Sequence, residues 1–185
     1  ALSASGALAG SAEDLATWLR ALLRGDGPVG DVLARLATPA TLADGRASHY
    51  GLGMHVTGID GVRLVGHGGH LPGFKNHVLL DPATGSGVVL LSNREETEPY
   101  LPALRVMARL LGIAPPRLDA PPLPRGLFVE ASGPAWLELG EGSATFMGSR
   151  DTLLPGATEG EAVALSPYLP MRLRRDGADI VGEVG

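Results

Sequence analysis

The residues most able to do chemistry form the run GHGGH at residues 66–70, which directly follows the alternating segment 62–65. This alternation predicts a strand that ends at His67 and places His67 on one face with Arg63 and Val65. Strand interiors usually avoid glycine, because it adds backbone freedom and contributes no packing. Two glycines beside a histidine therefore indicate close approach by another molecule or another backbone segment.

A histidine at this place could bind a substrate carbonyl or carboxylate, or stabilise charge in a transition state. The alternative is an ordinary histidine at the end of a strand. A metal site is a further alternative, but strand positions three apart point to opposite faces, and no helical HExxH spacing occurs. We therefore predict no metal and no cofactor, although the metal alternative has five candidate ligands: His49, His55, His67, His70 and His77.

No serine lies in the G-x-S-x-G pattern of a nucleophile elbow. The segment 85–87 (GSG) reads as a hairpin turn, and Ser92-Asn93 reads as a turn at the end of a strand. The sequence therefore offers no serine nucleophile of that type.

Composition limits the class of protein. The 185 residues are 44% hydrophobic and 19% charged, which suits one domain, or one domain and part of a second. The net charge of −5 and the lack of a basic patch argue against nucleic acid as a partner. The absence of cysteine excludes disulfides and thiolate chemistry, and no run of 18 apolar residues predicts a membrane span. None of this assigns a compartment.

Three helices are expected to flank the candidate strand. Residues 11–25 form the clearest one, with a capping box begun by Ser11, a stop at Gly25, and an apolar stripe of Leu15, Trp18, Leu19, Leu22 and Leu23. A short helix is expected over 29–36, and another over 99–111.

Four strands are expected in this part of the chain, over 50–59, 61–67, 76–80 and 88–91. A tight turn at Asp60-Gly61 joins the first two, and hairpin-like spacing favours antiparallel pairing. The last strand is wholly apolar, which predicts burial on both faces.

Prolines between residues 114 and 126 predict a semi-rigid linker after a first domain at 1–113. Residues 127–185 then predict an antiparallel barrel or sandwich. About 59 residues are few for a barrel with its own core, so we expect this module to be incomplete. Its expected strands are 127–131, 136–139, 144–147, 163–165, 171–174 and 180–184.

The order of these motifs resembles the C-terminal half of the catalytic domain in the penicillin-recognising serine hydrolases. This superfamily includes class C β-lactamases, DD-peptidases, esterases and D-aminopeptidases, and the resemblance covers about residues 5–112. It implies an α/β (α+β) fold, namely a partial β-lactamase/transpeptidase-like domain with an antiparallel sheet flanked by helices, followed by a small β-barrel-like module. The resemblance rests on YGLGM (50–54), VGHGGHLPGF (65–74), DPATGSG (81–87), VVLLSN (88–93) and a closing helix.

Such enzymes combine S-x-x-K, Y-x-N and K-T-G or H-x-G motifs. By this resemblance His67 lines the pocket, Gly68 and Gly69 let the substrate backbone lie against the strand, and the backbone N–H of His70 is an oxyanion-hole donor. The H-x-G form followed by a β module is most similar to the D-aminopeptidase and esterase branch. That branch implies a small peptide, amide or ester substrate with a D-residue.

The sequence departs from the family in one large respect. No serine has a lysine three positions later, since Lys75 is the only lysine, and no tyrosine has an asparagine two positions later. We therefore expect a partner half that carries S-x-x-K and Y-x-N, and a chain that is inactive and marginally stable alone. The alternatives are a non-catalytic binding or regulatory homologue, and a β module that itself binds a peptide or polymer.

Overall fold

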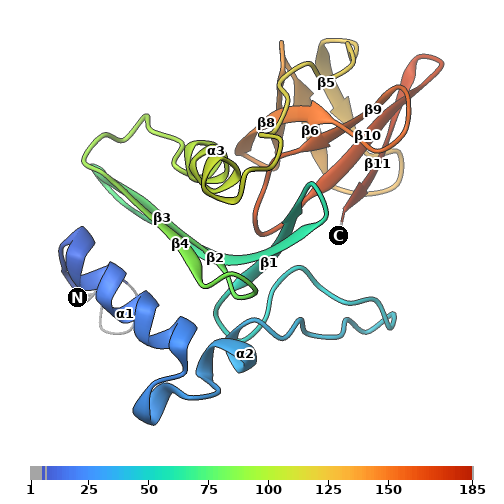
Figure 1. Cartoon of the computed structure of the whole chain (residues 1–185). Coiled ribbons are helices and arrows are strands. Elements are labelled where there is room, and N and C mark those ends of the chain that lie inside the picture. The colour runs from blue at the N-terminus through green and yellow to red at the C-terminus, as the bar shows by residue number, and fades with distance from the viewer. Residues whose placement is uncertain (1–5, 7, 185) are drawn as a thin grey trace. The chain divides into compact units, whose positions relative to one another are not determined.

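The computed structural model describes residue 6 and residues 8–184, and the first residues of the expected 1–113 domain lie outside that part. The chain divides into two compact units, Ala1–Pro115 and Pro116–Gly185. Within the described residues, the first unit combines helices with a four-stranded sheet, and the second contains strands but no helix (Figure 1). No described helix is long and apolar enough to cross a membrane.

Helix α1 (Ala12–Arg24) confirms the expected start and stop. Ser11 and Asp14 form the reciprocal capping box, and Gly25 ends the helix in the left-handed conformation at φ 65°. Leu19 and Leu22 are buried, but Trp18 is 44% exposed. Including Trp18 in the core stripe was wrong, because it lies at the flank of the stripe, beside the residues that face the sheet.

Of the two other expected helices, the first is divided into two short pieces and the second agrees with the structure. The single helix expected over 29–36 is instead a 3₁₀ turn, η1 (Gly27–Val29), followed by α2 (Val32–Leu36). Helix α3 (Tyr100–Leu111) agrees with the expected helix and ends at Gly112, whose φ is 68°. Its buried residues are Tyr100, Ala103, Leu104, Met107 and Ala108.

The sheet is antiparallel, in the order β1-β2-β3-β4. The tight turn is confirmed, since Asp60 and Gly61 both have positive φ, 50° and 78°. Two boundaries were wrong: the first strand begins at residue 55, because Tyr50 makes only an isolated bridge, and the second continues four residues past His67. The strands are β1 (His55–Ile59), β2 (Val62–Leu71), β3 (Phe74–Asp81) and β4 (Ser86–Ser92).

Helices cover both faces of this sheet (Figure 1). On one face, Val65, Val78 and Leu80 join α1 and α2 in a buried cluster. Strand alternation turns the neighbouring residues His77 and Leu79 to the other face, toward α3.

Strand β4 was expected to be buried on both faces, but most of its residues are partly or fully exposed. Leu91 is 43% exposed, and Val88 is the one residue of β4 that is buried. The expectation was wrong because β4 is an edge strand of the sheet as far as the structure describes it.

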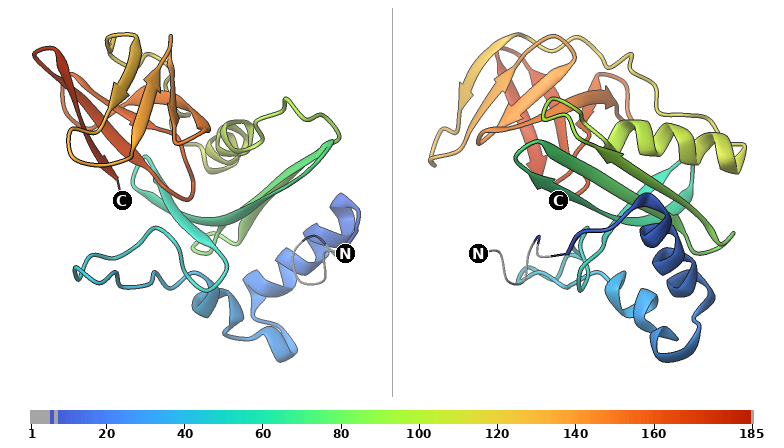
Figure 2. Two further views of the ribbon diagram at one scale, coloured as in Figure 1. Left: turned by 180° about the vertical axis from the view of Figure 1, so that it is seen from behind. Right: turned by 90° about the vertical axis from the view of Figure 1, so that its left-hand side faces the viewer.

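The second unit is a seven-stranded antiparallel sheet that curls into a nearly closed barrel (Figure 2). The sequence prediction missed β8, whose polar start and terminal Pro155 hide its alternation. Eight buried residues, among them Leu139, Leu153 and Leu173, form a hydrophobic core inside this unit, although its length was expected to be small for a barrel with its own core. The strands are β5 (Gly126–Val129), β6 (Trp136–Leu139), β7 (Ser143–Phe146), β8 (Ser149–Pro155), β9 (Glu161–Ala164), β10 (Met171–Asp176) and β11 (Asp179–Val184).

Candidate functional site

His67 lies on β2 with an exposed side chain. Its face is the one expected: Val65, two residues earlier, is buried in the cluster with α1 and α2, and His67 continues that row beyond the cluster. The ring of Tyr50, from the YGLGM segment, meets the His67 ring edge-on with centroids 6.0 Å apart. The structure thus presents the imidazole to solvent at the end of a well-packed sheet face.

The backbone of β2 changes its surroundings at the same place. Strand β1 pairs with β2 only up to the His55–Gly66 pair, whereas β3 follows β2 as far as Leu71. From His67 onward, β2 therefore has a strand neighbour on one side only, within the described residues. An edge of this kind is a surface along which an extended peptide can align.

Gly69 shares the face of His67, and its lack of a side chain already serves a neighbour. A Cβ built on Gly69 would lie 2.6 Å from Nδ2 of Asn76, the residue paired with it on β3. The space above Gly69 is therefore filled by the Asn76 amide, whose end could move aside. This contact is a structural reason for glycine that the sequence did not reveal.

Gly66 makes room for a buried histidine pair on the opposite face of the sheet. His55 of β1 pairs with Gly66, and His77 of β3 pairs with Gly68, so the two rings meet over a glycine-lined stretch of β2. Their Nε2 atoms are 2.9 Å apart. A Cβ on Gly66 would lie 2.9 Å from Nε2 of His55 and 2.3 Å from the Val78 carbonyl oxygen.

The hydrogen bond needs one Nε2 that carries a proton and one that does not, so at least one of the two rings is neutral. Burial lowers the pKa of His55 to about 3, with smaller contributions from His77 and His67, and burial lowers the pKa of His77 to about 4. Tyr100 of α3 packs against both rings, with centroids 5.5 Å and 4.7 Å away. Its hydroxyl donates to Oγ1 of Thr57 at 2.8 Å.

The side chain of His70 contacts Glu95, which also binds the turn between β2 and β3. Its Nε2 contacts Oε1 of Glu95, and the other carboxylate oxygen accepts the Gly73 N–H at 2.6 Å. These hydrogen bonds hold the pKa of Glu95 below its usual value, the Gly73 bond contributing most. One carboxylate, that of Glu95, therefore fixes both the position of the β2–β3 turn and the orientation of the His70 side chain.

The described residues contain no set of ligands for the metal site that was considered as an alternative. Nowhere in that part of the chain do three or more His, Cys, Asp or Glu side chains form a group that could hold a metal ion. Instead, His55 and His77 face one side of the sheet, His67 faces the other, and His70 contacts Glu95.

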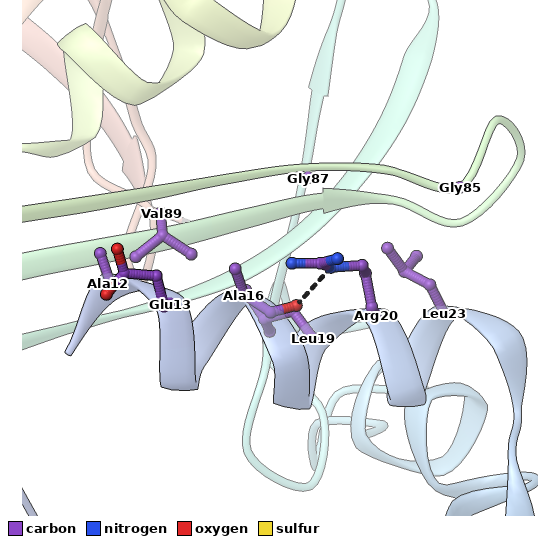
Figure 3. Close-up of a pocket in the computed structure, with 9 residues that line it drawn as sticks. All are labelled: Ala12, Glu13, Ala16, Leu19, Arg20, Leu23, Gly85, Gly87 and Val89. Atoms are coloured by element: carbon purple, nitrogen blue, oxygen red, sulfur yellow. Dashed lines mark hydrogen bonds between the residues drawn. The ribbon is translucent and has the colours of Figure 1, made fainter. Parts of the chain in front are cut away.

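A cavity of about 510 Å³ lies between α1 and the β3–β4 hairpin (Figure 3). Its lining includes Ala16 and Arg20 of α1 and Gly87 of β4, and the Arg20 Nε donates to the Ala16 carbonyl at 3.2 Å. Neither His67 nor His70 lines it, so this cavity is separate from the predicted site.

The fold defines a β-lactamase-like domain, with an antiparallel sheet between helices. Residues 2–112 match the family model described as Beta-lactamase, and the chain belongs to this family. The sheet and the candidate strand lie within the matched residues, whereas the barrel does not.

One solved structure shows a similar fold along most of this chain. The chain is similar to the octameric penicillin-binding protein homologue from Pyrococcus abyssi, with a TM-score of 0.54 and 19% identity over 95% of this chain and 45% of that one. It is also similar to SurE (TM-score 0.44, 20% identity, 94% and 46% covered) and to SurE with D-Leu (0.45, 22%, 95% and 48%). The chain therefore spans less than half the length of these proteins. No curated protein matches it.

Proposed function

We propose that this chain supplies one wall of the active site of a serine hydrolase that cleaves an amide or ester through an acyl-enzyme. The observation that carries the proposal is the exposed His67 in the H-x-G position of a chain that belongs to the β-lactamase family. The substrate class that fits the H-x-G branch is a small peptide, amide or ester with a D-residue.

Each residue of the run has a role that its position allows. The His67 imidazole hydrogen-bonds the substrate, and the substrate backbone lies along the strand at Gly68 and Gly69, where the end of the Asn76 amide moves aside to admit it. The backbone N–H of His70 donates to the oxyanion of the tetrahedral intermediate. Because Glu95 holds the His70 side chain, that imidazole takes no part in the chemistry.

The nucleophile and its base come from the partner half. A hydroxyl needs an adjacent base to become a nucleophile, and the S-x-x-K and Y-x-N motifs that supply one are absent from these 185 residues. We infer that this chain has no acyl-transfer activity alone and gains it with the half that carries these motifs.

Kinetics of the complete protein test the proposal. His67→Ala should lower kcat/KM for the best substrate by about 100-fold or more while the far-UV circular dichroism is unchanged, because the side chain is exposed. His49→Gln is the matched histidine control and should leave kcat/KM within about twofold. The substrates to compare are D- and L-amino-acid p-nitroanilides, a p-nitrophenyl ester and a chromogenic cephalosporin.

Two results would contradict the proposal. Equal kcat/KM in the wild type and His67→Ala removes His67 from the site. A complete protein that binds these compounds but turns none of them over is the non-catalytic homologue of the alternative hypothesis.

A further inference from the structure

The barrel of the second unit contains its own cavity, unrelated to the H-x-G strand. It has a volume of about 510 Å³ and lies between β5–β7 on one side and β10–β11 on the other. Ligand sites in proteins usually have volumes of about 300–1,000 Å³. The cavity is therefore large enough for one small molecule.

Aromatic side chains gather around this cavity. The whole chain has two tryptophans, three tyrosines and three phenylalanines, and three of these eight residues line it: Phe128, Trp136 and Phe146. All three are half-buried, whereas the two leucines of the lining, Leu137 and Leu173, are buried. The rings are thus left partly open beside the cavity, where a ligand can cover them.

The charged residues of the lining have one sign. Glu130 and Asp179 both line the cavity, and no lysine, arginine or histidine does. The barrel register explains this: Met171 and Leu173 of β10 face inward, so the alternating residues Arg172 and Arg174 face outward.

We propose that the second unit binds a small organic cation, an ammonium or guanidinium group on an apolar body, in this cavity. Aromatic rings attract cations through their faces, and carboxylates bind ammonium groups by charge-assisted hydrogen bonds. The apolar body lies against the aromatic rings and the leucines of the lining. An anion of the same size is rejected, because Glu130 and Asp179 repel it.

The test uses the whole 185-residue chain with Trp18→Phe, which leaves Trp136 in the cavity as the sole tryptophan. Three probes of matched size are titrated while its fluorescence is followed: 4-phenylbutylamine, 4-phenylbutanol and 4-phenylbutanoate. We expect saturable binding of the amine, about tenfold tighter than the alcohol, and the weakest binding for the carboxylate.

Two variants separate recognition of charge from simple apolar binding. Glu130→Gln with Asp179→Asn should weaken the amine about tenfold, to the affinity of the alcohol, and leave the alcohol unchanged. Glu138→Gln removes an exposed carboxylate on β6 that does not line the cavity, and should change nothing.

The proposal is overturned by equal affinities for the three probes, by an amine affinity that the double variant leaves unchanged, or by no saturable signal with any probe. It is independent of the serine hydrolase, because no residue of the first unit enters it.

Discussion

The buried His55–His77 pair gives the sharpest stability prediction. In the folded chain both pKa values lie far below the 6.5 of an exposed histidine, at about 3 and about 4. The folded state therefore binds fewer protons than the unfolded state between these values and pH 6.5. Stability should be greatest above pH 6.5 and should fall as the pH is lowered through that value.

The size of the effect follows from the two pKa differences. At pH 5 each histidine is mostly protonated in the unfolded chain and neutral in the folded chain, which costs about 2 kcal/mol per residue relative to pH 8. Both rings are buried, so solvent does not screen this cost. The pair should thus lower the free energy of unfolding by about 4 kcal/mol between pH 8 and pH 5.

The assay is urea unfolding at pH 8 and pH 5, followed by Trp18 fluorescence in a Trp136→Phe background so that α1 reports on the first unit. Carboxylates titrate mainly below this pH range. His77→Gln keeps a side chain that hydrogen-bonds but does not titrate, and should remove about half of the pH dependence. His49→Gln should retain all of it.

An unchanged pH dependence in His77→Gln would refute this reasoning. So would nuclear magnetic resonance showing the His55 and His77 rings protonated in the folded chain at pH 5. Either result would mean that the pair is open to water or that its rings separate.

Further substitutions test the local packing. Gly66→Ala should lower the free energy of unfolding by about 2 kcal/mol, because the new Cβ would meet a backbone oxygen at 2.3 Å, and urea unfolding measures this. Gly69→Ala should cost less than Gly66→Ala, since only the end of the Asn76 side chain must move, and a larger loss for Gly69→Ala would contradict this contact. Glu95→Gln should speed hydrogen exchange at the Gly73 amide, because a neutral amide oxygen accepts more weakly than a carboxylate, and unchanged exchange would remove Glu95 as the clamp of the turn.

Features set by neighbouring residues could be predicted from the sequence. The capping box at Ser11, the stop at Gly25 and the tight turn at Asp60-Gly61 depend on contacts over a few positions, and the structure contains all three. The face of His67 also followed from strand alternation alone.

Features set by contacts between distant residues could not. Whether Gly66 serves a ligand or a neighbouring side chain depends on the register of β1 and β3, which brings His55 and His77 together across β2. The exposure of Leu91 likewise depends on which strands flank β4. The sequence did contain one signal for the buried histidine pair: the two strands expected on either side of the glycine-containing strand each carry a histidine, His55 and His77.

Covalent labelling of the complete protein with a fluorophosphonate, followed by peptide mass spectrometry, tests the central proposal most directly. The account predicts one adduct on the serine of an S-x-x-K motif outside these 185 residues, formed more slowly in His67→Ala. An adduct on a serine within these residues, or no adduct at all, would contradict the claim that this chain forms one wall of a serine hydrolase site.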